Sequence, residues 1–260
     1  MKRLILSSII VSIVFIGCDS PFEFTAGSTS PSTGFSVRLP TIEEEADTII
    51  GMIQNYDYFR KEGYYDFKLP GYPIVDSLYK KVSEGGTISP SDRDELISVV
   101  GSYYSELNYS ELYTKINSII ETANTRYHIF ERYNKKWGFY IPKNGFVVTM
   151  SIYSDYSTVS GNSAIIIGYP RKYDTPNVIL HIIFHEAFHI GYMNSPETIV
   201  LSYWQNERLT DLFVNHHFTS VTQISMYQSN DSSIDRIFEG QNKQEVWDDL
   251  PNRIRQFLGR

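Results

Sequence analysis

The sequence predicts an α+β fold that is mainly helical, with a small mixed sheet placed before one strongly apolar helix. Apolar residues recur at three- and four-residue spacing from Thr41 to about Glu131. Runs of β-branched and aromatic residues follow, and a helical pattern resumes at Thr175-Pro176. We therefore expect one folded domain over residues 37–260, with a helical part at 37–134 and the sheet and further helices at 135–260.

The N-terminal helices are marked by apolar spacing and by their first residues. The first of them carries apolar side chains about one turn apart, such as Ile49 and Met52. The third is expected to open at Ser89-Pro90-Ser91, because serine can cap free amides and proline suits the first helical turn. The fourth is expected to begin at Asn108 or Ser110.

Three runs rich in β-branched and aromatic residues predict the sheet. They cover residues 136–141, 145–153 and 163–169. Turn-forming segments separate them, Pro-Lys-Asn-Gly after the first and Ser-Gly-Asn before the last.

The N-terminus has the parts of a bacterial signal peptide at residues 1–17: a positive start, an apolar run and Gly17 before Cys18. Its ending, Phe15-Ile16-Gly17-Cys18, resembles the lipobox of bacterial lipoproteins, which implies that Cys18 becomes the lipidated first residue of the mature protein. The alternative is an ordinary secretory signal with an incidental cysteine.

Residues 18–36 are rich in Ser, Thr, Pro and Gly and are expected to form a flexible tether. We therefore expect a lipid-anchored, extracytoplasmic protein of the bacterial cell envelope, facing the periplasm or the cell surface.

The composition of the chain indicates which binding partners and which stabilising bonds it can have. Acidic residues outnumber basic ones by 30 to 23, so the charge balance offers no basic footprint for nucleic acid. The single cysteine excludes an internal disulfide, so the core must stabilise the fold, with a metal ion as a possible second contribution. We expect a monomer that contacts the membrane through its lipid.

The run from Asn177 to about Tyr192 is apolar nearly all round, which is typical of a buried helix. Thr175 is expected to cap this helix and Pro176 to be its first residue. The helix nevertheless carries three histidines and Glu186. Burying such groups costs several kcal/mol unless each has a partner, and a metal ion supplies one.

The spacing of His185, Glu186 and His189 is that of an HExxH motif. Residues four apart lie on one helix face, so both imidazoles can reach one tetrahedral zinc ion. Glu186 flanks that face, where its carboxylate can take a proton from the zinc-activated water as a general base.

A second element downstream, Asn206-Glu207-Arg208-Leu209-Thr210-Asp211, resembles the N-E-x-x-[ST]-D segment of the gluzincin metallopeptidases. The resemblance implies a zincin-like metallopeptidase fold with Glu207 as the third ligand of a single Zn²⁺ ion. It also implies that Asp211 orients a zinc-binding histidine through the other ring nitrogen. It spans only His185 to Asp211, about a tenth of the chain, and the connection from His189 to Glu207 is slightly shorter than usual in that group.

The sequence offers other candidates for the third ligand besides Glu207. Metzincins require a glycine and a histidine where this chain has Tyr192 and Ser195, which excludes that group. Glu197 follows Ser195-Pro196 and is expected to lie in a helical first turn rather than on the metal. Since a helix starting at Pro196 would carry Glu207 about 16 Å from its start, we expect the helix to begin nearer Leu201 or to cross its neighbour obliquely. His181 is expected to be a satisfied core or orienting histidine rather than a ligand.

Several histidines and tyrosines near the motif are candidates for a further role in catalysis. His217, His216 and Tyr192 are candidates for stabilising the transition state, with Tyr203 and Tyr227 competing for the same role and helix-end solvation as the alternative for the histidines. By the same resemblance, residues 163–169 would form an edge strand that pairs with an extended substrate, with an interior strand as the alternative.

The expected function is peptide-bond hydrolysis by a lipid-anchored zinc metallopeptidase acting on a peptide or protein substrate. A Trp-x-Asn-Glu sequence resembling that of aminopeptidases is present, but no G-x-M-E-N element accompanies it, so we expect an endopeptidase. One alternative is a non-catalytic lipoprotein whose structural zinc site serves binding or adhesion. Another is a tethered binding protein in which the motif occurs by chance.

Overall fold

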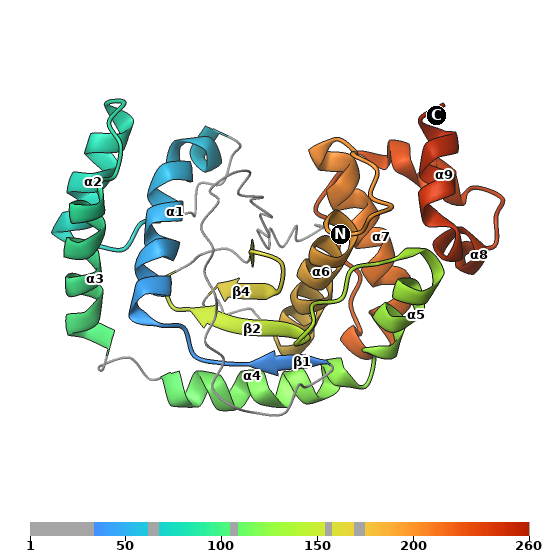
Figure 1. The fold of residues 1–260 in the computed structure, drawn as a ribbon, viewed down its shortest axis with the longest axis horizontal. Coiled ribbons are helices and arrows are strands. Elements are labelled where there is room, and N and C mark those ends of the chain that lie inside the picture. Colours follow the sequence, from blue (N-terminus) through green and yellow to red (C-terminus); the bar gives the residue numbers. More distant parts are fainter. Residues whose placement is uncertain (1–33, 62–67, 105–108, 154–157, 169–174, 260) are drawn as a thin grey trace, which may run out of the picture.

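A computed structural model describes residues 34–61, 68–104, 109–153, 158–168 and 175–259 (Figure 1). The signal peptide, Cys18 and the tether up to residue 33 lie outside the described residues. Within the described ranges, no helix combines the length and apolar character needed to cross a membrane.

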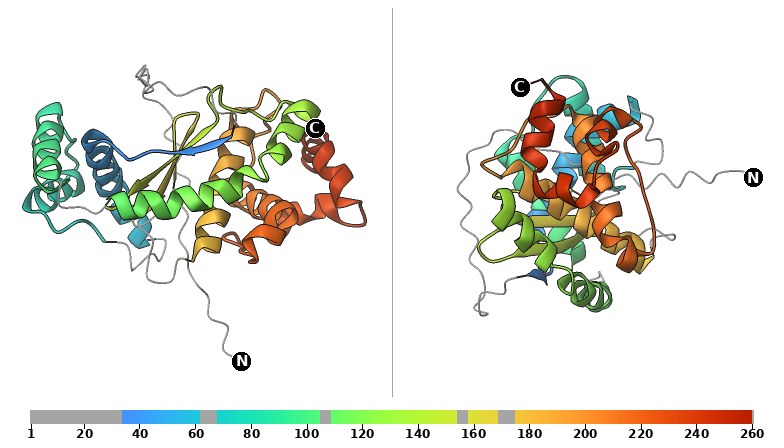
Figure 2. Two further views of the ribbon diagram at one scale, coloured as in Figure 1. Left: turned by 90° about the horizontal axis from the view of Figure 1, so that it is seen from below. Right: turned by 90° about the vertical axis from the view of Figure 1, so that its right-hand side faces the viewer.

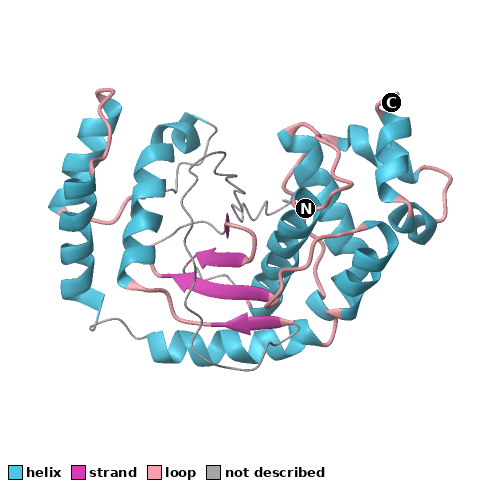
Figure 3. Ribbon diagram, in the orientation of Figure 1, coloured by secondary structure: helices cyan, strands magenta, loops and turns pink. Residues whose placement is uncertain are grey.

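The molecule is mainly helical around a small mixed sheet, as the α+β prediction states (Figure 3). The sheet has the strand order β1-β2-β4-β3, formed by β1 (Phe35–Val37), β2 (Phe146–Ser151), β4 (Ala164–Gly168) and β3 (Thr158–Ser160). β1, β2 and β4 run parallel, and β3 pairs antiparallel with β4.

The sheet corrects three sequence predictions. β1 begins at Phe35, so the end of the predicted tether belongs to the sheet. Residues 136–141 form no strand, because α5 (His128–Trp137) continues to Trp137 and ends at Gly138 in the left-handed region. β4 lies between β2 and β3 and is therefore an interior strand, so the predicted edge strand at 163–169 is wrong.

The N-terminal helices form a separate small core beside the sheet. α1 (Ile42–Lys61) packs against α2 (Pro73–Ser83) and α3 (Pro90–Tyr104), at the left of Figure 1. The start predicted at Ser89-Pro90-Ser91 is confirmed for α3, and Ser89 Oγ accepts from the Asp92 amide. This core buries Ala46, Ile49, Ile53, Val75, Leu78, Leu96 and Val100.

A buried carboxylate joins α1 to the sheet. Glu45 is fully buried and accepts hydrogen bonds from Tyr109 Oη at 2.6 Å, Ser151 Oγ at 2.5 Å and the Ile152 amide at 3.1 Å. Burial raises the pKa of Glu45, although its three donors oppose that shift. The contacts tie α1 to the end of β2 and to the first residue of α4 (Tyr109–Asn124), a helix whose start is predicted to within one residue.

The larger core surrounds α6 (Pro176–Met193), which contacts β3, β4, α4 and α7 (Tyr203–Thr222). The chain then closes this end of the molecule with η1 (Ser232–Phe238), α8 (Lys243–Asp248) and α9 (Leu250–Phe257) (Figure 2). Large aromatic side chains fill the space between these elements; the fully buried ones here are Phe130, Tyr133, Phe139, Phe146, Phe184, Phe188, Phe213, Phe218 and Trp247. α6 is therefore an interior helix, as its apolar sequence predicts.

Gly191 lets α6 approach a buried aromatic ring. A Cβ atom at this position would lie 1.9 Å from Cζ of Phe139, which is itself fully buried. The backbone of the two segments is joined as well, because the Tyr140 amide donates to the Gly191 carbonyl at 2.9 Å.

We expect Gly191→Ala to destabilise the full chain by about 3 kcal/mol, because the added methyl group overpacks a core that cannot yield. Urea unfolding measures the loss. Gly101→Ala is the matched control, since its Cβ would meet Ile42 at an ordinary 3.6 Å and alanine favours a helix. Equal stabilities for the two variants would show that the close approach of Phe139 does not constrain α6.

Candidate metal centre

α6 begins at the predicted residues and carries the HExxH motif through the protein core. Thr175 Oγ1 accepts from the Val178 amide at 3.3 Å and Pro176 is the first helical residue, as predicted. Every residue from 178 to 192 is buried. His185, Glu186 and His189 therefore lie in the protein interior with no exposed surface.

α7 brings Glu207 to the same place. Its first residue, Tyr203, follows a capping box in which Ser202 and Gln205 bond each other's amides. The helix thus begins close to Leu201, which confirms that prediction. Glu207 stands one turn inside α7, is 1% exposed and faces the two histidines of α6.

Three ligand-type atoms converge between α6 and α7. Nε2 of His185 lies 3.0 Å from Nε2 of His189. The Glu207 carboxylate lies 3.2 Å from the first of these nitrogens and 3.4 Å from the second. A tetrahedral zinc site with bonds of about 2.0–2.1 Å holds its ligand atoms roughly 3.3 Å apart. The three residues could therefore hold a metal ion with little rearrangement.

The second nitrogen of each imidazole also faces a polar group. Asp211 Oδ1 lies 3.4 Å from Nδ1 of His185, as the sequence resemblance implies. Asn206 Nδ2 lies 3.3 Å from Nδ1 of His189, while Asn206 Oδ1 is buried with no partner among the described residues. Exchanging the amide oxygen and nitrogen of Asn206 would satisfy that oxygen with the Nδ1–H of His189. Both histidines would then carry the proton on Nδ1 and keep the Nε2 lone pair for a metal.

Asp211 is fixed by backbone groups. Its Oδ2 accepts from the Gln228 amide at 2.7 Å and from the Ser229 amide at 3.5 Å. The other oxygen is thereby left for His185. Asp211 is fully buried, so the two backbone amides offset part of the cost of burying its charge.

The electrostatics of the cluster favour positive charge between the three ligand residues. Burial works to lower the pKa of His185, but hydrogen bonds and charges from Asp211 and Glu207 outweigh it and raise that pKa well above its usual value. Burial works to raise the pKa of Glu207, but the histidines lower it below the ordinary range. A proton can supply that positive charge, and so can a divalent cation.

His181, one turn before His185 on α6, departs from its predicted state. It is fully buried, and neither ring nitrogen has a hydrogen-bond partner among the described residues. The interpretation as a satisfied histidine is therefore wrong. Burial and the nearby His185 lower the pKa of His181 to about 3, which keeps its ring neutral.

The three candidates for transition-state stabilisation are engaged elsewhere. His217 Nε2 lies 2.9 Å from Tyr133 Oη, and its ring packs against Phe213. His216 is exposed and lies beside Trp247. Tyr192 Oη donates to the Ile199 carbonyl at 2.7 Å.

The two competing tyrosines pack against other side chains. Tyr203 is partly exposed and packs against Trp204. Tyr227 is exposed and lies over the guanidinium of Arg208. Glu197 stands in a turn rather than a helix and bonds Arg255 at 2.5 Å, which corrects its predicted capping role.

Sequence reasoning missed Gln228. Its Nε2 lies 3.2 Å from Nε2 of His185, and its side chain is partly exposed. Gln228 therefore lies next to the ligand atoms of the candidate metal site. It stands in a segment without regular structure, and no spacing in the sequence relates it to the HExxH motif.

Comparison of the chain with protein-family models, with curated proteins and with solved structures finds no match.

We expect His189→Ala and Glu207→Gln to remove the first equivalent of zinc bound by the purified full chain. Zinc at about a thousand times its dissociation constant should stabilise the unchanged chain by about 4 kcal/mol, and both variants should lose that gain. Metal analysis and thermal unfolding measure the two effects. His128→Ala is the control, because His128 is exposed. Undiminished zinc binding in both variants would place the metal elsewhere.

Proposed function

We propose that this chain is a zinc-dependent metallopeptidase that hydrolyses peptide bonds in a peptide or protein substrate. The observation that carries the proposal is the convergence of His185, His189 and Glu207, within 3.0–3.4 Å of one another, beside the buried Glu186. The HExxH and N-E-x-x-T-D elements add the resemblance to gluzincins.

The donor set suits zinc. Two imidazole nitrogens and one carboxylate oxygen are the usual protein ligands of a catalytic zinc, which keeps a fourth position for water or substrate. Bound there, zinc would supply Lewis acidity, which acidifies water and polarises a carbonyl group.

The chain's own residues would perform the proton transfers and hold the ligands in place. Glu186 accepts the proton of the attacking water and then delivers it to the amine that leaves when the C–N bond breaks. Asp211 holds His185 through Nδ1, and Asn206 holds His189 in the same way. The proposal includes an endopeptidase, since no element for binding a free amino terminus is evident in the sequence.

Complete burial of the ligand residues favours one second candidate, a non-catalytic lipoprotein with a structural zinc site. Structural sites are closed, usually with four protein ligands. Gln228 lies close enough to His185 for its amide to fill the fourth position. This candidate predicts bound zinc and no cleavage of any peptide.

We expect Glu186→Gln to keep its zinc and to lower turnover by about 10²–10⁴-fold, because the variant lacks the general base. Peptide-library cleavage by the zinc-loaded full chain, read by mass spectrometry, measures the loss. Glu197→Gln makes the same chemical change at an exposed, ion-paired position and should alter nothing. Full activity in Glu186→Gln would remove Glu186 from the mechanism, and zinc binding without cleavage by the unchanged chain would favour the structural site.

We also propose that the protein is lipid-anchored in the bacterial cell envelope through Cys18, outside the cytoplasm. The lipobox-like sequence at residues 15–18 supports this. Several acyl chains on one cysteine would make a stable anchor, whereas a single chain binds membranes only marginally.

We expect Cys18→Ser to move the protein from the membrane fraction to the soluble fraction of bacteria that express it, because serine cannot be lipidated in this way. Fractionation followed by immunoblotting measures the shift. Ser20→Ala is a control two residues away that leaves the cysteine intact. Membrane retention of Cys18→Ser would contradict a lipid anchor at this residue.

A further inference from the structure

α6 and α7 carry histidines and carboxylates, respectively, at four-residue spacing on the sides where the two helices meet. On α6, His181, His185 and His189 follow one another at four-residue spacing. On α7, Glu207 and Asp211 have the same spacing. Glu207 lies between His185 and His189, and Asp211 lies near both His185 and His181. The arrangement of two imidazoles with one carboxylate thus occurs twice, one helical turn apart.

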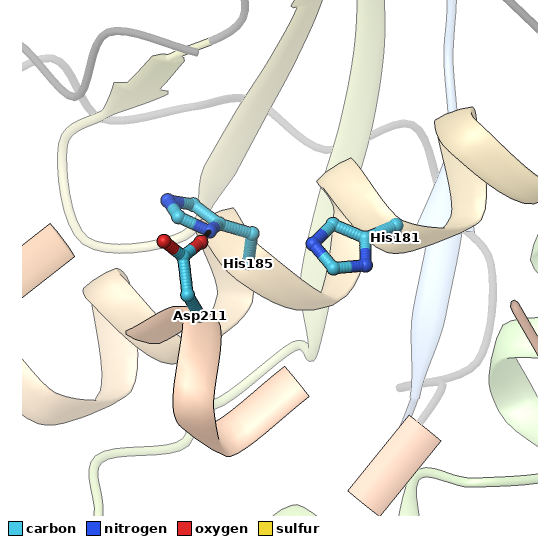
Figure 4. Close-up of side chains that lie close together, drawn as sticks. All are labelled: His181, His185 and Asp211. Atoms are coloured by element: carbon cyan, nitrogen blue, oxygen red, sulfur yellow. Dashed lines mark ion pairs between the residues drawn. The ribbon is translucent and has the colours of Figure 1, made fainter. Parts of the chain in front are cut away.

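The second group shares His185 with the first but can use its other ring nitrogen. Ligand atoms of His181, His185 and Asp211 all lie within 4.8 Å of one another (Figure 4). Within this group, His185 Nδ1 lies 3.4 Å from Asp211 Oδ1. Nε2 of His185 faces Glu207 and His189, whereas Nδ1 faces Asp211.

His181 supplies an independent reason to expect a ligand here. Its ring is fully buried beside His185, and both of its nitrogens lack hydrogen-bond partners among the described residues. An unsatisfied buried polar group costs about 1–3 kcal/mol. A ligand bound by one of these nitrogens would remove part of that cost.

We propose that His181, His185 and Asp211 form a second divalent-cation site, which shares the imidazole of His185 with the first site. Binding of the second ion releases the Nδ1 proton of His185 to solvent, and the resulting imidazolate bridges the two ions. Two nitrogens and one carboxylate suit Zn²⁺ or Cu²⁺ rather than Mg²⁺ or Ca²⁺, which prefer oxygen ligands. The second site rests on the proposed metal site at His185, His189 and Glu207, although not on its peptidase activity.

Copper titration of the purified full chain tests the second site. The first Cu²⁺ equivalent should give a full paramagnetic resonance signal. The second should abolish most of that signal, because an imidazolate bridge couples the two unpaired electrons. Calorimetry with Zn²⁺ in two buffers of different ionisation enthalpy should show one proton released with the second equivalent.

His181→Leu is the variant that isolates the second site, since leucine has similar bulk and no ligand atom. It should keep the first equivalent with its full signal and lose the second. His181→Gln repeats the test with a polar side chain. Binding of only one Cu²⁺ equivalent by the wild-type chain would overturn the second site. A second equivalent whose paramagnetic resonance signal adds to that of the first would also overturn it. So would a second equivalent that still binds to His181→Leu. If either variant fails to fold, the titration of the wild-type chain alone decides whether the second site exists.

The outcomes also separate this inference from the proposed function. A single equivalent that is lost in His189→Ala and unaffected by His181→Leu would reject the second site and keep the first. Absence of any tight equivalent would reject both sites. Two coupled equivalents without peptide cleavage would support the second site and reject the peptidase.

Discussion

The burial of α6 on all sides is the constraint on which the rest of the site depends. Every residue from 178 to 192 is buried, so no histidine or carboxylate of this helix can turn to solvent. Their polar atoms must be satisfied by other buried groups or by a ligand. For His185 and His189, α7 supplies those groups, with Glu207 and Asp211 one turn apart on the face that meets α6. A local sequence feature thus dictates a long-range pairing of two helices.

Much of this arrangement follows from local sequence signals. Thr175 and Pro176 fix the start of α6 because a cap and a first-turn proline act within a few residues. The four-residue spacing of the histidines sets their common face without any knowledge of the fold. The zincin-like fold itself stays a prediction, since the described architecture establishes only a mainly helical α+β fold with a small mixed sheet.

The errors arise where long-range contacts decide the outcome. Residues 163–169 read as a strand, but only the pairing of β3 shows that β4 is interior. The aromatic run at 136–141 has strand character, yet α5 extends to Trp137 and ends at Gly138. The Trp137 ring packs against Tyr133, Phe139 and Tyr192. Gln228 contacts His185 from a segment without regular structure, so no periodic pattern in the sequence predicts this contact.

The register between α6 and α7 is held from more than one direction. The capping box at Ser202 and Gln205 sets where α7 begins, and the amides of Gln228 and Ser229 hold Asp211 from the opposite side. A shift of α7 by one turn would move each carboxylate past its pair of imidazoles and would break the backbone bonds to Asp211. Because α7 begins at Tyr203 rather than at Pro196, even the short connection from His189 places Glu207 in the first turns of the helix. The hydrogen bonds at the start of α7 and at Asp211 thus act together with the short connection to bring Glu207 opposite His185 and His189.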